Sequence, residues 1–568
     1  MALLTLPGRR ASRLVLAILP LVASTTALGG EPSLFPDRAI AWQEHDDDDV
    51  ARKPAVTFLH EMPGTLFFRD SVSGEVDRVL AAEGRRPARD VNAMDEVPRS
   101  TWFCPRNHLA PMSPAAVAAG PPGTLPPKPP LRILKGKEEG ATPGFRVVDA
   151  NGRKFMLKLD PAGHLGLTTG AEMVGERFFH AAGYNVPGAF LLDLAPEDLV
   201  VDPKATYLVF DVEPRPLTEA QVRKTLSKAA RGAEGRVRAV LTPWIQGEIL
   251  GGFDMLGRRE DDPNDRIPHE DRRSLRASWA LFAWLGEIDP GAPNTLDTYV
   301  KERGRRFVRH YIIDFGATLG SFTTRSDGLH EGTEYVIEVG RTLGSLLSLG
   351  LYRRPFEGER AAWERHVGDY AAAGWFPAEG FDPEQYRPRL KVPAHMRRTD
   401  RDLYWGAKLV TSFTDAQIAA VVATAGMPTR DAAYVQHALE VRRDIIGRRY
   451  LRPMTAVESP AISSDGTQLC FDDLAIARGY ADVKEVRYAT AIRDGQGRVL
   501  ATSDVTPAGA HTCVSLGGAG SGDAYRVVAL TTSLGAGRNG TRSKAARIHL
   551  RWRAEESRFV VVGSERDE

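Results

Sequence analysis

The pattern of apolar and polar positions changes at Leu131, where a proline-rich stretch gives way to short apolar segments. The pattern predicts three strands, at 131–134, 144–149 and 154–159. An Asn151-Gly152 turn joins the second strand to the third, as in an antiparallel hairpin. The next segment, 170–182, has apolar residues at helical spacing, and Gly183 follows it as a typical helix end. We therefore expect an antiparallel sheet followed by a helix.

Longer elements are predicted in the second half of the chain. Apolar residues on one face predict a long helix at 269–285. Two strands, 295–300 and 307–313, flank a charged turn and form a hairpin, and residues 335–451 are mostly helical. From residue 456 onward, short strands alternate with glycine-rich turns, which is typical of a β-sandwich of the immunoglobulin or fibronectin kind. The fold class predicted for the whole chain is α+β.

The chain is too long for a single hydrophobic core, and it divides into parts that differ in composition and in the pattern of apolar residues. Residues 30–130 form an irregular N-terminal arm that ends in a Pro-rich linker, because repeated Pro-Pro pairs disfavour both helix and sheet. Within the arm, Asp46 to Asp49 lack the spaced oxygen ligands of a calcium loop, so we predict a solvated acidic turn there. The remaining parts are a sheet-rich region, a helical region and the sandwich, at 131–250, 251–455 and 456–568.

Composition excludes some classes of partner. Lys and Arg (74) nearly balance Asp and Glu (73), so the net charge gives no reason to expect binding to nucleic acid. Apolar residues make up 42% of the chain, as in an ordinary globular protein. No apolar run after the first thirty residues is long enough to cross a bilayer, so we expect no transmembrane segment in the mature chain.

The N-terminus has the order of a secretory signal peptide. Three arginines precede the apolar run 14–23, which is followed by small residues at 24–30. A run of this length is too short to span a membrane, so we assign residues 1–29 to a signal peptide, with a mistaken start codon as the alternative. The mature chain is then secreted, or lies in the periplasm or cell envelope.

Three cysteines, Cys104, Cys470 and Cys513, show no metal-binding spacing. Cys470 and Cys513 both lie in segments predicted as strands, and two alternatives remain open for them. They either form a disulfide within the C-terminal domain or stay as two buried thiols, and the pattern favours the thiols.

Candidate chemistry begins at Lys158, which stands alone in an apolar strand. A buried lysine is costly unless an acid or a phosphate pairs with it, although a lysine at a strand edge can instead extend its amine to solvent. Glu172 and Glu176 follow on one face of the predicted helix, and Glu172 is the better candidate partner because it lies nearer the helix start.

Two further motifs follow the predicted long helix. Asp289 and Asn294 have four residues between them, the spacing of a kinase catalytic loop. After the hairpin, an apolar strand leads directly into Asp314-Phe315-Gly316, where an acid at a buried strand end suits a metal ligand.

The order of these residues over 131–451 resembles the protein-kinase-like superfamily. It is most similar to the atypical branch, which includes HipA-type, phosphatidylinositol and secretory-pathway kinases. The resemblance implies a bilobal fold, with an N-lobe at 131–250 and a helical C-lobe at 251–455. It also implies binding of ATP with Mg²⁺ or Mn²⁺ and a role for each residue: Lys158 on the phosphates, Glu172 as its partner, Asp289 as the base, and Asn294 and Asp314 as metal ligands.

The sequence departs from the family pattern at two places. No G-x-G-x-x-G precedes Lys158; a looser loop that contains Lys135, Gly136 and Gly140 offers amides and lysines to the phosphates instead. The His-Arg that usually precedes the catalytic Asp is replaced by Glu287-Ile288.

Three functions are compatible with this sequence. The first is an atypical kinase that transfers the ATP γ-phosphate to an unknown hydroxyl acceptor on a protein, lipid or sugar. The second is a secreted pseudokinase that binds nucleotide without turnover, favoured by the scarcity of ATP outside the cytoplasm. The third is a surface-binding protein that acts through its β-sandwich.

Overall fold

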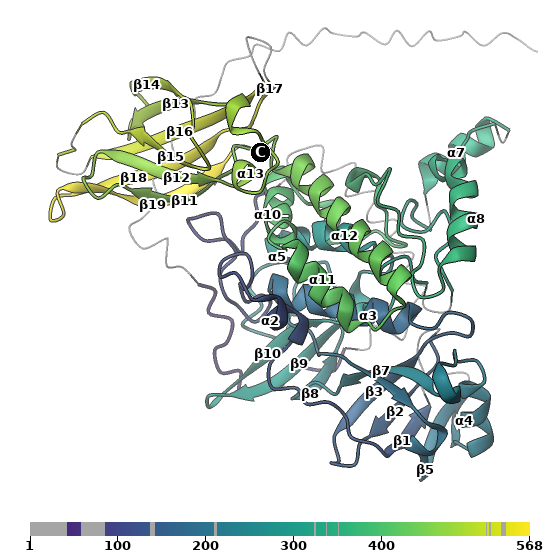
Figure 1. The fold of residues 1–568 in the computed structure, drawn as a ribbon. Helices are drawn as coiled ribbons and strands as arrows, with labels where there is room; N and C mark the ends of the chain where they lie inside the picture. The colour runs from purple at the N-terminus through teal and green to yellow at the C-terminus, as the bar shows by residue number, and fades with distance from the viewer. Residues whose placement is uncertain are drawn as a thin grey trace, which may run out of the picture.

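The structure is a computed structural model that describes most of the chain: residues 43–57, 86–136, 142–209, 213–322, 325–336, 338–349, 351–518, 520–521, 524–535 and 541–568. The predicted signal segment, 1–29, and Gly140 lie outside the described residues. The fold is mixed α+β, as predicted, with four sheets in the described part of the chain. Figure 1 shows helices in the middle of the molecule and sheets at both ends.

The first sheet contains seven strands in the order β4-β7-β3-β2-β1-β5-β6. Its strands are β1 (Leu131–Gly136), β2 (Gly144–Val148), β3 (Lys154–Leu159), β4 (Phe190–Leu194), β5 (Leu199–Val209), β6 (Glu213–Pro216) and β7 (Val237–Pro243). The antiparallel pairing of β1, β2 and β3 confirms the prediction, whereas β1 and β5 pair in parallel. One face is covered by α4 (Glu219–Leu226), whose Val222 and Leu226 join the core of the sheet.

Helix α3 (Leu167–Ala182) joins the first sheet to the rest of the molecule. It begins three residues before the predicted start and ends at Gly183, where a left-handed backbone at φ 135° suits glycine. Every residue of α3 is buried. The helix contacts β3, β4 and β7 as well as α2 (Pro114–Ala119) and α11 (Asp415–Thr424), so its position fixes the sheet relative to the helices.

The long helix predicted at 269–285 is wrong as a single element. It is divided into a 3₁₀ turn (His269–Asp271), α5 (Arg273–Arg276) and α6 (Ser278–Leu285). Arg272 has an extended backbone at this break, and its buried guanidinium donates to both carboxylate oxygens of Glu44 at 2.8 and 2.9 Å. Apolar spacing gives no signal of this ionic contact with the arm.

The predicted hairpin is confirmed as β9 (Thr295–Glu302) and β10 (Arg305–Ile312), to which β8 (Glu248–Gly251) adds a third strand. The region predicted to be mostly helical contains six helices in the described residues: α7 (Val339–Leu347), α8 (Arg360–Asp369), α9 (Pro393–Met396), α10 (Asp400–Val410), α11 and α12 (Thr429–Tyr450). Apolar side chains of α3, α6, α10, α11 and α12 form one core.

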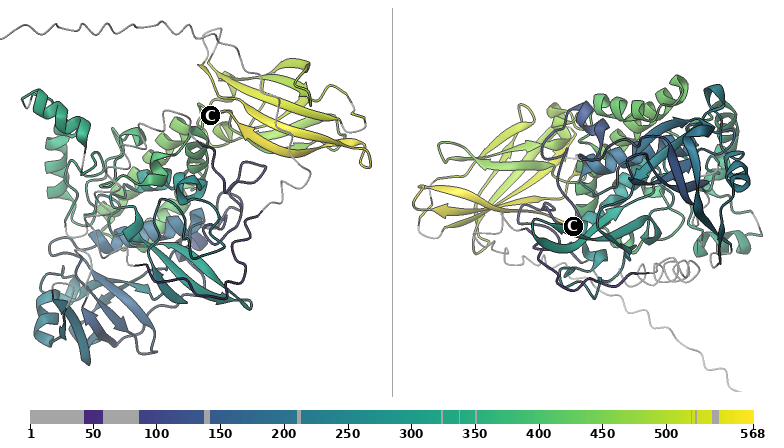
Figure 2. Two further views of the ribbon diagram at one scale, coloured as in Figure 1. Left: turned by 180° about the vertical axis from the view of Figure 1, so that it is seen from behind. Right: turned by 90° about the horizontal axis from the view of Figure 1, so that it is seen from below.

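The C-terminal residues form two sheets that stand to one side of the helices, away from the first sheet (Figure 2). The smaller sheet has the order β11-β12-β15, and the larger has the order β14-β13-β16-β18-β19 with β17 beside β16. Their bounds are β11 (Val457–Ile462), β12 (Gln468–Asp473), β13 (Val486–Asp494), β14 (Val499–Val505), β15 (His511–Ser515), β16 (Tyr525–Leu534), β17 (Thr541–Arg542), β18 (Ala546–Arg553) and β19 (Arg558–Arg566). Apolar residues of both sheets share one core.

Cys470 and Cys513 form a disulfide, so the preference for two buried thiols is wrong. The two residues are direct cross-strand partners in β12 and β15. Sequence spacing does not show this, because the two cysteines are 43 positions apart and two strands of the other sheet lie between them in the chain.

The N-terminal arm is more ordered than its sequence predicts. Asp46 is 3% exposed and accepts hydrogen bonds from the backbone N–H and hydroxyl of Thr101, so the solvated acidic turn is wrong at that position. Asp47 and Asp49 pair with Arg305 and Arg306 of the β9–β10 hairpin. The arm therefore packs on the hairpin through charge pairs that a local sequence pattern does not reveal.

Among the described residues, no helix combines the length and the apolar character needed to cross a membrane.

Candidate functional site

Lys158 lies on β3 with its side chain inside the protein, not at a solvent-exposed edge. Its ammonium donates to Glu172 Oε2 at 2.8 Å and to Asp314 Oδ1 at 2.7 Å, and the residue is 5% exposed. Burial by itself lowers the pKa of a lysine, but the two carboxylates outweigh burial and raise the pKa of Lys158. The lysine is therefore held as a cation at a defined position.

Glu172, on the first half of α3, is the carboxylate that meets Lys158, as the sequence predicted. Glu176, one turn later, pairs instead with its neighbour Arg177. Burial raises the pKa of Glu172, and the nearby Asp314 raises it further, although Lys158 acts in the opposite direction. Two carboxylates thus share one ammonium.

Asp314, Phe315 and Gly316 follow β10 directly. Asp314 has a left-handed backbone at φ 62°, which is uncommon for a residue with a side chain and concentrates at functional sites. Its side chain remains 35% exposed, so one side of the carboxylate faces solvent while the other holds Lys158. Acids in such a position can bind a cation from the open side.

Phe315 anchors this tripeptide against α3. The ring is 1% exposed and lies 4.9 Å from the ring of Phe179. A methyl group at Gly175 of α3 would come within 2.7 Å of Phe315 Cβ, so the absence of a side chain at Gly175 allows the close approach. The helix that carries Glu172 thus also positions Asp314.

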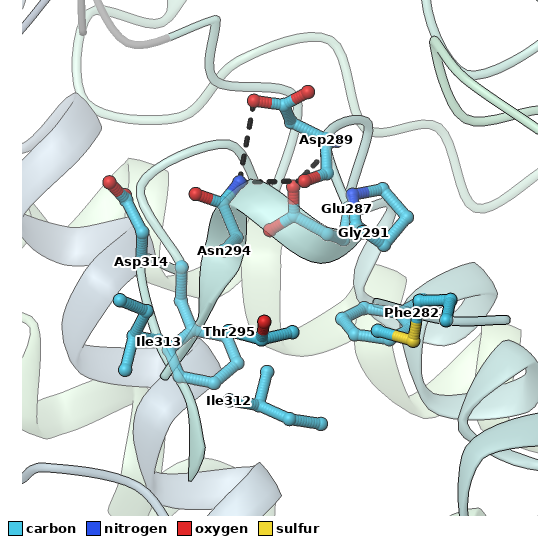
Figure 3. Close-up of a pocket in the computed structure, with 12 residues that line it drawn as sticks. Phe282, Glu287, Asp289, Gly291, Asn294, Thr295, Ile312, Ile313 and Asp314 are labelled. Carbon is cyan, nitrogen blue, oxygen red and sulfur yellow. Dashed lines mark hydrogen bonds between the residues drawn. The ribbon is translucent and has the colours of Figure 1, made fainter. Parts of the chain in front are cut away.

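The loop between α6 and β9 carries Asp289 and Asn294. The Asn294 amide donates to the Asp289 backbone carbonyl at 2.7 Å and to Asp289 Oδ2 at 3.3 Å. In the view of Figure 3, Asn294 lies between Asp289 and Asp314. All three residues line one small pocket, which brings the predicted base and both predicted metal ligands together.

Glu287 is a member of this loop whose role the sequence did not reveal. It is 2% exposed, and its Oε1 accepts the backbone N–H of Asp289 at 2.8 Å. Burial raises the pKa of Glu287 well above its ordinary value, and the neighbouring acids Asp289 and Asp314 raise it further. Through this hydrogen bond, Glu287 holds the Asp289 backbone in place.

Asp289 itself is partly buried. Burial raises its pKa, with a smaller increase from Asp314, while Arg389 and the Asn294 hydrogen bond act in the opposite direction. A raised pKa moves a carboxylate toward the range in which it can accept a proton at neutral pH.

The predicted phosphate loop is only partly described. Lys135 and Gly136 end β1, and Gly136 pairs with Phe145, next to the Gly144–Lys158 pair of β2 and β3. These residues therefore lie at the same end of the sheet as Lys158. Gly140, the third predicted loop residue, is outside the described part of the chain.

The donor set fits a hard divalent cation. Asp314 offers a carboxylate and Asn294 an amide oxygen, and Mg²⁺ and Mn²⁺ prefer oxygen ligands of this kind. The Asp314 carboxylate is 35% exposed, so a cation can reach it from the solvent side.

Comparison with known proteins gives no match for this chain among family models, curated proteins or solved structures.

Proposed function

We propose that the chain is an atypical kinase-like protein that transfers the γ-phosphate of ATP to a hydroxyl acceptor. The observation that carries this proposal is the contact of Lys158 with both Glu172 and Asp314, residues 14 and 156 positions away in the chain. A lysine held by a helix carboxylate beside an Asp-Phe-Gly acid is the arrangement that phosphate and metal binding require in kinases. If these residues matched the family pattern only by chance, there would be no reason for the side chains of Lys158, Glu172 and Asp314 to contact one another.

The arrangement of elements supports the same proposal. In this interpretation, residues 131–250 are the N-lobe and residues 251–455 are the helical C-lobe, with α3 between them. Residues 456–568 are then a β-sandwich of immunoglobulin or fibronectin type, supported by the core that its two sheets share.

Each residue has a distinct task in the proposed reaction. Bound ATP with Mg²⁺ or Mn²⁺ supplies the phosphoryl group and the charge that stabilises its transfer. Lys158 holds the phosphates, while Asp314 and Asn294 provide oxygen ligands. Asp289 accepts the proton of the attacking hydroxyl, and Glu287 keeps the Asp289 backbone in place.

A pseudokinase is the second candidate, and the Asn294–Asp289 contact favours it. The amide of the predicted metal ligand is bonded to the predicted base, which closes the loop on itself. A chain that binds nucleotide without turnover needs no free base. A surface-binding function through the C-terminal sheets is left if nucleotide does not bind at all.

Thermal unfolding with nucleotide tests the binding step. Saturating ATP with Mg²⁺ or Mn²⁺, at about 100 times its Kd, is expected to raise Tm by roughly 4 °C. Lys158→Met and Asp314→Asn are expected to abolish the rise. Lys154→Met is the matched control, because Lys154 is exposed on the same strand and its variant should keep the full rise. No rise for the parent chain with either metal would exclude both nucleotide-binding functions.

Transfer of labelled γ-phosphate tests turnover in the same preparations, with proteins, lipids and sugars as acceptors. Asp289→Asn is expected to keep the thermal rise while transfer falls about 10²- to 10⁴-fold, because a positioned base is lost. A parent chain that binds nucleotide but labels no acceptor, itself included, would be a pseudokinase.

A further inference from the structure

A second cluster of reactive side chains lies on the outer face of the small C-terminal sheet, far along the chain from Lys158. Strands β12 and β15 pair so that Cys470 is opposite Cys513 and Asp472 is opposite His511. Because side chains two positions apart share a face of a strand, these four form a two-by-two grid. The alternate residues Leu469, Phe471 and Val514 are buried in the core on the other face.

His511 is oriented toward the disulfide by Asp472. Its Nδ1 lies 2.8 Å from Asp472 Oδ1, and its Nε2 lies 3.9 Å from Cys513 Sγ. A proton on Nδ1 is held by the carboxylate, so Nε2 is the nitrogen that exchanges a proton with sulfur. A carboxylate, an imidazole and a cysteine sulfur in this order form a relay like that of cysteine nucleophiles.

The grid is open to solvent and to a partner. His511 and Asp472 side chains are 67% and 51% exposed, and both cysteines are partly exposed. Cys470 is opposite Ala461 on β11, whose methyl group is exposed and leaves the approach to the Cys470 sulfur open. In the described part of the chain, β15 is the edge strand of its sheet.

Other charged groups near the grid point elsewhere. Glu458 pairs with Asp472 in the register of β11 and β12, but its carboxylate binds Lys408 and Arg566. Asp472 and His511 are therefore the charged groups that face the disulfide in the contacts of these three strands.

We propose that Cys470 and Cys513 form a thiol–disulfide exchange site whose substrate is a dithiol, with His511 as its acid–base residue and Asp472 as the residue that positions His511. This activity is independent of the kinase-like function proposed above. A disulfide that serves only to cross-link two strands requires no aligned imidazole beside one of its sulfurs.

The exchange proceeds through a mixed disulfide. A thiolate of the dithiol attacks Cys470 Sγ and forms a new S–S bond, while the Cys470–Cys513 bond breaks. The electron pair goes to Cys513 Sγ, which takes a proton from His511 Nε2. Cys513 is the leaving sulfur because its Sγ lies 3.9 Å from His511 Nε2, the nitrogen that supplies the proton.

The second thiolate of the dithiol then attacks the first dithiol sulfur, which is bonded to Cys470 Sγ in the mixed disulfide. The new S–S bond closes the oxidised dithiol, and the Cys470 thiolate is released and takes up a proton. In sum, the dithiol loses two electrons and two protons and becomes a disulfide, and the cysteine pair gains both.

The rate of reduction of the folded, full chain tests this site. The variant Cys104→Ser serves as the background, so that only one cysteine pair is followed. Dithiothreitol is the reductant in one arm, and a protein with a reduced Cys-x-x-Cys pair is the reductant in the other. Alkylation of the released thiols and mass spectrometry give the rate between pH 5 and 9. Faster reduction in the second arm would identify a protein as the source of the dithiol.

His511→Gln is expected to slow reduction at least about tenfold at neutral pH and to remove the inflection of its pH profile. Asp472→Asn should slow reduction by a smaller factor and should displace the inflection of the pH profile of the reduction rate. His437→Gln is the matched control, since His437 is also an exposed histidine beside a carboxylate, that of Glu379, and carries no sulfur neighbour in its described contacts.

Three results would overturn the proposal. The first is a His511→Gln variant whose reduction rate and pH profile equal those of the His437→Gln control. The second is a disulfide that resists both dithiols in the folded chain and is reduced only on unfolding. Finally, a reduced pair that binds Zn²⁺ and is then no longer reoxidised by a disulfide would assign these residues to a metal site.

Discussion

Glu176 is a buried acid of α3 whose contribution to stability depends on pH. Burial raises its pKa to about 7, against the opposing effect of Arg177. The folded chain therefore binds this proton more tightly than the unfolded chain, whose carboxyl has an ordinary pKa of 4.5. The resulting contribution to stability is complete below about pH 4.5 and is lost as pH rises through about 7.

Glu176→Gln is expected to remove this dependence. At pH 8 the variant should be more stable than the parent by about 3 kcal/mol, because no buried charge has to form. At pH 4 the two should be equal. Urea unfolding at both values measures the difference, and Glu219→Gln, at an exposed position of α4, is the control. A gain that is the same at both pH values would contradict the assignment of the proton to Glu176.

Single residues also show what the sequence can and cannot predict about the site. The preference for Glu172 over Glu176 as the partner of Lys158 follows from position along one helix, and the structure bears it out. The sequence does not identify Glu287 as a site residue. Its raised pKa results from burial and from the nearby acids Asp289, Asp314 and Asp327, which come from other positions in the chain. Local spacing identifies residues of one element, but it does not reveal which acids share a buried space.

At the scale of elements, the packing of α3 on Phe315 decides whether Asp314 reaches Lys158. A Cβ at position 175 would lie 2.7 Å from Phe315 Cβ, so Gly175→Ala must displace the ring or the helix. We expect a loss of about 1–3 kcal/mol in the free energy of unfolding and a weaker thermal response to ATP.

Gly368→Ala, in α8, is the matched control for this substitution. A Cβ at that position meets no atom within 4 Å, so the change should be neutral or stabilise by up to about 1 kcal/mol. Urea unfolding of both variants makes the comparison. Equal stabilities would show that α3 does not depend on Gly175 for its contact with Phe315.

Elements are predictable from sequence where local pattern and packing agree. The hairpin of β9 and β10 and the helix before Gly183 have the expected type because alternation, spacing and turn residues act together. The break at Arg272 has another origin: its guanidinium is buried against Glu44, 228 positions earlier in the chain. This long-range contact breaks the helix that the apolar spacing of 269–285 predicts, and the spacing itself does not indicate the contact.

At the scale of the whole molecule, a buried ionic network joins the C-terminal sheets to the helices. Arg566 of β19 donates to Asp95 of the arm at 3.2 Å and to Glu458 of β11 at 2.8 Å. Lys408 of α10 contacts the same Glu458 at 2.6 Å. Burial by itself raises the pKa of Glu458, but Lys408 and Arg566 outweigh it and lower the pKa to about 2.

This network should make the attachment of the C-terminal sheets sensitive to acid. Because the folded pKa of Glu458 lies below its ordinary value of 4.5, its contribution is present above pH 4.5 and is lost as pH falls toward about 2. Asp95 acts in the same direction, since Arg273, Arg401 and Arg566 lower its pKa although burial raises it.

Arg566→Met is expected to weaken the attachment at neutral pH by about 3–5 kcal/mol, because Asp95 and Glu458 lose a shared cation inside the protein. Unfolding should then separate into two transitions, with limited proteolysis releasing the segment 456–568 under conditions in which the parent is intact. Arg558→Met, on the same strand with a side chain that is 44% exposed, is the control and should unfold like the parent. If both variants unfold together with the parent, the network does not hold the two parts of the molecule together.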